Sequence, residues 1–537
     1  MSQGPNLGLE RNLIERVAVG DNLRRRARSC PQAEAVVDYG GGRREAWTYA
    51  ALNARVNRCV RGLRSIGLRQ GDRIGIVSGN CVDFITVLYA CYKGGFVAVP
   101  LNYVQHPDDC AWTLNHAGVA AVVVESALRE MFAPADAQLP AAVRRLVAGP
   151  LQGPHGLSLA SLIEDQPDDE ILDTMIGDRD TVQIMYTSGT TSRPKGVMTS
   201  NLALVLGPMT NAVTFGFRPP FSQLNVLPLF HITAVIGLLL CVQMSGKYVM
   251  LRGFDPARVV ELLEAERIAN FVGLPMMWKA LMAVPGVRQR DFSALQRGTY
   301  GMAAMDAESL ARLREVFGVP FDLGSGQTEF TPCPVVYLDG SETEFGAGNY
   351  WGRSTPLVDQ AILDDEGREL PPGEVGEICW RGAQAMNGYY RNEEATAEAR
   401  KFGWHHTGDL GLVDAKGQLL FVDRKKDIIK SGGENVSSMR VEQALLGFEG
   451  VAVAAAIGLP HPHWGEAVCA VVQPKPGVKL DEAAILAHCK RHLGAFEAPK
   501  RVMVVESVPM TATAKIKKNE LRQQFGSLFD GAPAERA

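Results

Sequence analysis

The sequence has ten cysteines in 537 residues but contains no Cys-x-x-Cys pair. Zinc knuckles and disulfide frameworks need closely spaced cysteines, so we expect neither, and we expect a reducing, cytoplasmic location. The chain also lacks an excess of positive charge, because its formal net charge is -4 at pH 7. Nucleic-acid binding requires a basic face, so we expect no nucleic-acid partner.

Long apolar runs are missing as well. The longest apolar segment, Ile232 to Met244, is shorter than the roughly 20 residues that a membrane-spanning helix needs. We therefore expect a buried core helix there and no transmembrane segment. Acidic residues Glu10, Glu15 and Asp21 argue against a transit peptide. With 46% hydrophobic and 21% charged residues, the composition is typical of a soluble globular enzyme with two or more domains.

Apolar runs alternate with helical patterns in two parts of the chain. The first part has a strand, a helix and a strand, at residues 73–78, 82–92 and 96–99. The second part repeats this order, at residues 247–251, 256–266 and 269–272. Such units form parallel crossovers, so the sequence predicts an α/β fold with doubly wound βαβ subdomains.

After about Gln360 the pattern changes to short strands with tight turns, which predict hairpins and a β-rich subdomain. The charged segment Asp423-Arg-Lys-Lys-Asp427 is the candidate linker. Beyond it, strands and a helix are expected at residues 451–457, 467–472, 482–492 and 502–506, the helix being the third. We therefore predict a large N-terminal domain of residues 1–422, a hinge at 423–427, and a small mobile α+β domain of residues 428–537.

Residues Thr187 to Gly196 have the sequence Thr-Ser-Gly-Thr-Thr-Ser-Arg-Pro-Lys-Gly and follow the apolar strand Val182 to Tyr186. Hydroxyl groups, main-chain N–H groups and cations gather in this one turn, as polyphosphate binding requires. A Walker A loop is excluded, because it needs Gly-Lys-Ser/Thr at the start of a helix. Pro194 places Lys195 on a loop that can swing over the phosphates. A polar surface turn is the plainer alternative.

The segment Gly324-Ser-Gly-Gln-Thr-Glu329 is a second glycine-rich turn. It lacks the third glycine of a dinucleotide-binding fingerprint, because Glu329 stands in that place. Such a turn lets the backbone approach a nucleotide, and its carboxylate can hold Mg²⁺ against phosphate oxygens. Taken alone, the segment also fits an ordinary structural turn.

Together these two segments resemble the phosphate loop and the Tyr-Gly-x-Thr-Glu motif of the acyl-adenylate-forming (AMP-binding) superfamily, in its acyl-CoA synthetase branch. Further similar motifs are Pro228-Leu-Phe-His231, Gly301-Met-Ala303, Thr407-Gly-Asp409, Ser431-Gly-Gly-Glu-Asn435 and Met510-Thr-Ala-Thr-Ala-Lys515. The resemblance covers nearly the whole chain, and it implies ATP, Mg²⁺ and CoA as cofactors.

The resemblance implies a role for each motif. It implies catalytic roles for His231, Lys195, Glu329 and Lys515, and it makes Glu329 the metal ligand. It assigns ATP or AMP binding to Thr187, Ser188, Gly189, Thr190, Thr191, Lys195, Gly326, Gln327, Thr328, Asp409, Arg424 and Lys515. It makes Lys426 the hinge residue. It assigns CoA binding to Gly432, Gly433, Glu434 and Trp464.

The acyl pocket is also implied by the resemblance. Its residues would be His231, Val235, Met276, Tyr300, Met302 and Ala303. Apolar walls suit a fatty, branched or aromatic acid. Residues 232–235 offer no carboxylate to pair with an ammonium group, so an amino acid substrate is disfavoured.

The implied activity is that of an AMP-forming acid–thiol ligase with a place in fatty acid metabolism. A carboxylic acid would attack ATP to give acyl-AMP and pyrophosphate, and CoA would then take the acyl group and release AMP. Two alternatives stay open: an acyl-AMP ligase that loads the phosphopantetheine of a carrier protein, and a non-catalytic nucleotide-binding homologue. A homodimer is compatible with the sequence.

Overall fold

The computed structural model describes residues 7–149, 157–187, 193–301, 305–339, 349–510 and 516–530. Contacts divide the chain into two units. The first contains the described residues within Met1–Ser188, Pro194–Gln360 and Trp380–His405. The second contains those within Gly189–Arg193, Ala361–Cys379 and His406–Ala537.

The first unit contains a mixed sheet with the strand order β19-β9-β8-β4-β3-β5-β6-β7. The strands are β3 (Arg73–Val77), β4 (Val97–Pro100), β5 (Ala121–Glu125), β6 (Arg144–Ala148), β7 (Leu157–Ser158), β8 (Thr181–Thr187), β9 (Lys195–Ser200) and β19 (Gly388–Tyr389). Strands β3 and β4 pair in parallel and are joined by α4 (Val82–Gly94). The first predicted crossover is thereby confirmed.

A second sheet of the same unit follows the order β16-β15-β14-β13-β12-β10-β11-β1-β2. Its strands are β1 (Glu34–Asp38), β2 (Glu45–Thr48), β10 (Ser222–Asn225), β11 (Lys247–Met250), β12 (Asn270–Gly273), β13 (Arg297–Gly301), β14 (Phe321–Ser325), β15 (Val335–Tyr337) and β16 (Asn349–Ser354). The second predicted crossover also forms, through α10 (Pro256–Ala265), but β11 and β12 are not neighbours. Strand β10 lies between them and pairs in parallel with both.

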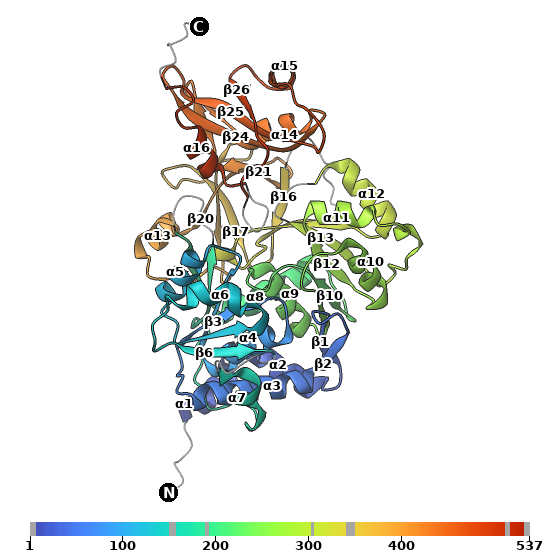
Figure 1. The fold of residues 1–537 in the computed structure, drawn as a ribbon, viewed down its shortest axis with the longest axis vertical. Coiled ribbons are helices and arrows are strands. Elements are labelled where there is room, and N and C mark those ends of the chain that lie inside the picture. Colours follow the sequence, from blue (N-terminus) through green and yellow to red (C-terminus); the bar gives the residue numbers. More distant parts are fainter. Residues whose placement is uncertain are drawn as a thin grey trace. The chain divides into compact units, whose positions relative to one another are not determined.

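Helices cover both faces of each sheet, which gives the first unit five layers. Consecutive strand residues point to opposite faces, so Ile76 joins the core between the two sheets while Val77 joins the core on the outer side. The middle layer contains α2 (Gly20–Ser29), α3 (Tyr49–Ser65), α4, α8 (Asn201–Phe215) and α9 (Ile232–Gln243). The outer layers contain α5 (Pro107–Ala117) and α6 (Arg129–Asp136) on one side, and α10, α11 (Pro275–Met282) and α12 (Ala307–Phe317) on the other. Figure 1 shows these last three helices alongside β12 and β13.

The predicted buried helix at Ile232 is confirmed as α9. Its residues are buried around almost the whole circumference, which is the pattern of a helix packed between two sheets. Within the ranges that the structure describes, no helix is both long and apolar enough to cross a membrane.

The second unit begins with hairpin-forming strands in the order β17-β18-β20-β21. They are β17 (Asp359–Leu363), β18 (Gly376–Arg381), β20 (His405–Val413) and β21 (Leu419–Arg424). Val413 pairs with Leu419 across residues 414–418, so β20 and β21 form one of the hairpins expected after Gln360.

The tail folds as an α+β sheet with the order β23-β22-β25-β24, and β26 pairs with β25. Its elements are β22 (Ile429–Ser431), β23 (Glu434–Val436), α14 (Ser438–Leu446), β24 (Val451–His461), β25 (Gly465–Pro474), α15 (Glu482–His492), β26 (Arg501–Val504) and α16 (Lys518–Phe525). Helices α14 and α15 cover one face of the sheet and α16 covers the other. The predicted α/β class, with a large N-terminal domain and a smaller C-terminal one, is confirmed.

Candidate active site

The predicted phosphate loop connects the two strands of a hairpin. Strand β8 ends at Thr187 and β9 begins at Lys195, and these two residues face each other in the antiparallel ladder. Lys195 was expected on a loop, but it is the first residue of a strand. The intervening Ser188, Gly189, Thr190 and Thr191 lie outside the described residues.

The glycine-rich turn after β14 brings Glu329 close to that hairpin. Glu329 lies in a 3₁₀ turn, Thr328–Phe330, and is only 9% exposed. Tyr389 donates its hydroxyl hydrogen to Glu329 Oε1 at 3.0 Å. Lys195 Nζ lies 4.8 Å from the centroid of the same tyrosine ring. The structure therefore joins Lys195 and Glu329 through Tyr389.

The neighbouring residues of this turn are held tightly by the backbone. A Cβ atom on Gly326 would lie 1.8 Å from Pro332 O, so no larger residue fits without a shift. Gln327 O accepts a hydrogen bond from Phe330 N at 3.1 Å, which closes the turn before Thr328 and Glu329. The turn thus has the close backbone packing that the sequence suggested for a nucleotide-binding segment.

Asp409 and Arg424 come together in the second unit. They face each other on β20 and β21, and Arg424 Nε lies 3.6 Å from Asp409 Oδ1. Gly408 has a φ of 72° and donates its N–H to Glu377 Oε1 at 3.0 Å, which anchors the turn before Asp409. Burial, reinforced by the charge of Arg424, lowers the pKa of the predicted hinge residue Lys426.

The predicted CoA-binding residues also lie together. Gly432 and Gly433, with φ values of 62° and 88°, form the two-residue turn between β22 and β23. Left-handed backbone at both positions is the geometry that glycine supplies in a tight hairpin. Gly432 N donates to Trp464 O at 2.9 Å, and exposed Glu434 follows directly. Sequence reasoning missed Lys500, whose Nζ lies 4.8 Å from the centroid of the Trp464 ring.

The predicted acyl-pocket residues lie in different parts of the first unit. Val235 is fully buried in the core between the two sheets, whereas Tyr300 is buried in the core on the far face of the second sheet. Met276, by contrast, is 64% exposed. Met302 and Ala303 lie outside the described residues, as does Lys515. The structure does not gather the described members into one cluster, and the pocket stays a prediction.

His231 lies at the N-terminus of α9. The turn before it is held by hydrogen bonds with Asn80, which is distant along the chain. Asn80 Nδ2 donates to Leu227 O at 3.0 Å, and Asn80 Oδ1 accepts from Leu229 N at 2.9 Å. The ring of His231 packs against Phe230, with centroids 4.8 Å apart. Asn80 has no local sequence signal, because its contacts lie about 150 residues away along the chain.

The donor set at Glu329 fits Mg²⁺. In the described part of the chain no group of three or more His, Cys, Asp or Glu side chains is arranged to hold a metal. Mg²⁺ needs no such cage when a nucleotide is bound, since one or two carboxylates and the phosphates hold it. A buried carboxylate with one hydrogen-bonded oxygen meets that requirement.

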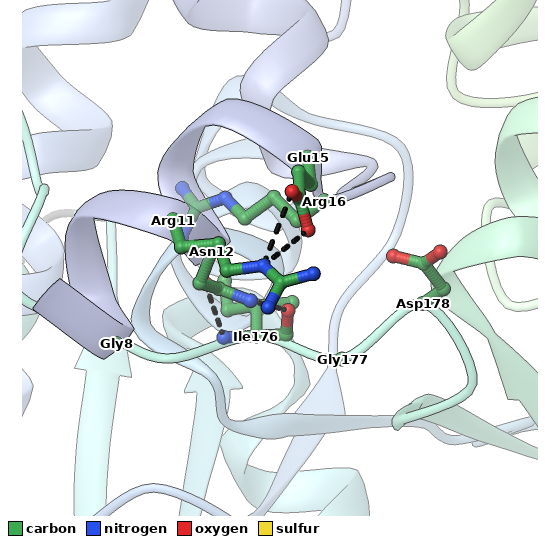
Figure 2. Close-up of a pocket in the computed structure, with 8 residues that line it drawn as sticks. All are labelled: Gly8, Arg11, Asn12, Glu15, Arg16, Ile176, Gly177 and Asp178. Carbon is green, nitrogen blue, oxygen red and sulfur yellow. Dashed lines mark hydrogen bonds and ion pairs between the residues drawn. The ribbon is translucent and has the colours of Figure 1, made fainter.

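A surface pocket of about 300 Å³ lies elsewhere in the first unit (Figure 2). Residues of α1 (Leu7–Glu15), Arg16 and residues 176–178 line it, and Asn12 links α1 to Ile176. Asn12 Nδ2 donates to Ile176 O at 2.8 Å, and Ile176 N donates to Asn12 Oδ1 at 3.1 Å. None of the residues lining this pocket was predicted to act on substrate.

Two family models match the chain in the order that the motifs predict. The model of the AMP-binding enzyme matches residues 23–390, and the model of the AMP-binding enzyme C-terminal domain matches residues 440–515. The chain belongs to the AMP-binding enzyme family. The residues matched by the first model include Lys195, Glu329 and Tyr389.

Similar members of the AMP-binding family are known. A feruloyl-CoA synthase from an Amycolatopsis species is 37% identical over 503 residues, which cover 94% of this chain and 98% of the relative. The long-chain-fatty-acid–CoA ligase FadD13 of Mycobacterium tuberculosis is 31% identical over 516 residues, which cover 95% of this chain and 99% of the relative. The crystal structure of ATP-bound MatB from Rhodopseudomonas palustris is 27% identical, with a TM-score of 0.84, and covers 95% of this chain and 100% of that one.

Proposed function

We propose that the chain is an ATP-dependent acyl-CoA synthetase, an AMP-forming acid–thiol ligase. It activates a carboxylic acid as acyl-AMP with release of pyrophosphate, then transfers the acyl group to CoA with release of AMP. The observation that carries this proposal is the contact of Lys195 and Glu329 with one tyrosine, in a chain of the AMP-binding family. The reaction uses ATP, Mg²⁺ and CoA.

The chemistry of activation explains the residue types. A carboxylate is a poor acyl donor, and joining it to the α-phosphate supplies a good leaving group. Lys195 would neutralise phosphate charge, and Lys515 would stabilise the charge that develops as the carboxylate attacks. Mg²⁺, when bound, screens the phosphate oxygens, and Glu329 supplies an oxygen ligand for it. Asp409 can accept hydrogen bonds from both ribose hydroxyls, and Arg424 would donate to the same sugar.

The second half-reaction needs a different set of residues. We assign the Gly432–Gly433 turn, Glu434 and Trp464 to CoA, and Lys426 to the hinge. The two family matches leave residues 391–439 between them, and the hinge proposed at 423–427 falls in that interval. Reorientation at a hinge would let one domain serve adenylation and then thioester formation while water stays excluded from acyl-AMP.

We propose an apolar carboxylic acid, fatty, branched or aromatic, as the substrate. An aromatic acid comes first in our panel because the relative that is 37% identical is named a feruloyl-CoA synthase.

We also propose a cytoplasmic location, supported by ten cysteines that are all free.

The acceptor is tested by supplying free CoA or a phosphopantetheine-bearing carrier protein under matched acid and ATP. We expect thioester on free CoA. Thioester on the carrier alone would instead establish an acyl-AMP ligase. The non-catalytic alternative is tested by acid-dependent exchange of labelled pyrophosphate into ATP, which we expect to observe.

A further inference from the structure

Tyr389 lies between one residue assigned to Mg²⁺ and one assigned to the phosphates, although it belongs to no motif that the sequence singled out. Its hydroxyl contacts Glu329, which lies 60 residues earlier in the chain, at 3.0 Å. The face of its ring lies 4.8 Å from Lys195 Nζ, within the range of a cation–π interaction. One side chain therefore contacts both a proposed metal ligand and a proposed phosphate ligand.

The backbone fixes the place of Tyr389 from several directions. Strand β19 pairs antiparallel with β9, the strand that begins at Lys195. Tyr389 N donates to Thr396 Oγ1 at 2.9 Å. Gly388 has a φ of 134°, a conformation that glycine adopts readily. Met386 N donates to Glu329 O at 2.8 Å, so the segment before Tyr389 holds the glutamate backbone as well.

The phenol suits the role of a hydrogen-bond donor. Its hydroxyl group donates a hydrogen bond to the side chain of Glu329. It contacts Oε1, and a carboxylate has a second oxygen with which to bind a cation.

We propose that Tyr389 is a positioning residue that orients the Glu329 carboxylate toward Mg²⁺ and the Lys195 ammonium toward the phosphates of ATP. This role rests on the proposed function. Fixing both side chains before ATP arrives reduces the conformational entropy that binding would otherwise cost. The hydroxyl serves the glutamate and the ring serves the lysine, so the two parts of the role are separable by mutation.

The test compares Tyr389→Phe, Tyr389→Leu and the wild type for binding of a nonhydrolysable ATP analogue, measured by calorimetry with and without Mg²⁺. Loss of the hydroxyl alone should weaken binding about tenfold with Mg²⁺, the worth of a hydrogen bond to a charged group, and change Mg²⁺-free binding little. Loss of the ring as well should also weaken Mg²⁺-free binding, by about threefold. In kinetics, Tyr389→Phe should raise KM for Mg·ATP and leave KM for CoA unchanged.

Two variants serve as comparisons. Tyr390→Phe removes a phenolic hydroxyl from the adjacent residue and should behave as wild type. Glu329→Gln should lose the Mg²⁺ effect, which is the difference between binding of the analogue with Mg²⁺ and without it. If Tyr389→Phe keeps the wild-type Mg²⁺ effect while Glu329→Gln loses it, the proposal is overturned. Equal weakening with and without Mg²⁺ in Tyr389→Phe would also overturn it, because that result indicates a purely structural role. Failure of the proposed function appears separately, as wild-type protein that exchanges no pyrophosphate with any acid.

Discussion

Gly326 shows at the scale of one residue why the turn before Glu329 has its sequence. We predict that Gly326→Ala destabilises the protein by about 1–3 kcal/mol or more, because the new methyl group would overlap Pro332 O. It should also weaken ATP binding, since the turn that carries Glu329 must shift. Urea unfolding and calorimetry with the ATP analogue measure the two effects.

Gly253→Ala is the matched control for this substitution. A Cβ atom there meets nothing within 4 Å, so both stability and ATP binding should stay close to wild type. Wild-type behaviour of Gly326→Ala would show that the turn is looser than the structure has it.

The residues of the site differ in how far sequence could predict them. Lys195 and Glu329 stand in short motifs, whose local composition already indicates phosphate and metal chemistry. Tyr389 and Asn80 act through contacts with residues that are distant along the chain, at 60 and about 150 positions. Such pairing is decided by the packing of the sheets, so no local pattern could reveal it.

At the scale of elements, Glu266 ties the edge of the second sheet to α10. Its carboxylate accepts hydrogen bonds from Tyr39 after β1, Arg44 before β2, and Lys247 at the start of β11. Burial alone would raise the pKa of Glu266, but these hydrogen bonds outweigh it and lower the pKa to about 2 from 4.5. The ionised carboxylate therefore stabilises the fold.

We predict that this stabilisation is present above pH 4.5 and is lost as the pH falls toward 2, because the unfolded state binds the proton more readily. Between pH 4.5 and 2, the unfolding free energy of Glu266→Gln should fall less than that of the wild type, by on the order of 1–2 kcal/mol. Urea unfolding at several acidic pH values measures it. Glu261, which forms a solvent-exposed ion pair with Arg258, is the control, since Glu261→Gln should leave the profile nearly unchanged. If the unfolding free energies of Glu266→Gln and wild type fell in parallel as the pH is lowered, the stabilising role of ionised Glu266 would be contradicted.

Most elements follow from their own residues. The helix expected at residues 482–492 has those bounds in the structure, and α9 is buried as its apolar sequence predicts. The order of strands does not follow in this way. The insertion of β10 between β11 and β12 depends on which strand pairs best across the whole sheet, and the periodicity of one segment carries no such information.

At the scale of the whole molecule, the two half-reactions should separate by mutation. We predict that Lys515→Ala slows adenylation by roughly 10²–10³-fold, because its charge opposes the charge that develops at the α-phosphate. Thioester formation from supplied acyl-AMP should change far less. Rapid-quench measurement of each half-reaction checks this prediction.

Lys517→Ala is the control for Lys515→Ala. Lys517 forms an exposed ion pair with Glu520 at 2.7 Å, so its loss should affect neither half-reaction. Equal loss in both half-reactions for Lys515→Ala would show that Lys515 does not act in adenylation specifically.

The most direct test of the central claim follows the products of one incubation by mass spectrometry. The purified chain is given ATP, Mg²⁺ and a panel of aromatic, branched and fatty acids, first without CoA and then with it. We predict acyl-AMP and pyrophosphate from at least one acid, followed by acyl-CoA and AMP once CoA is added. Absence of acid-dependent acyl-AMP with every acid, or release of ADP in place of AMP, would contradict the account.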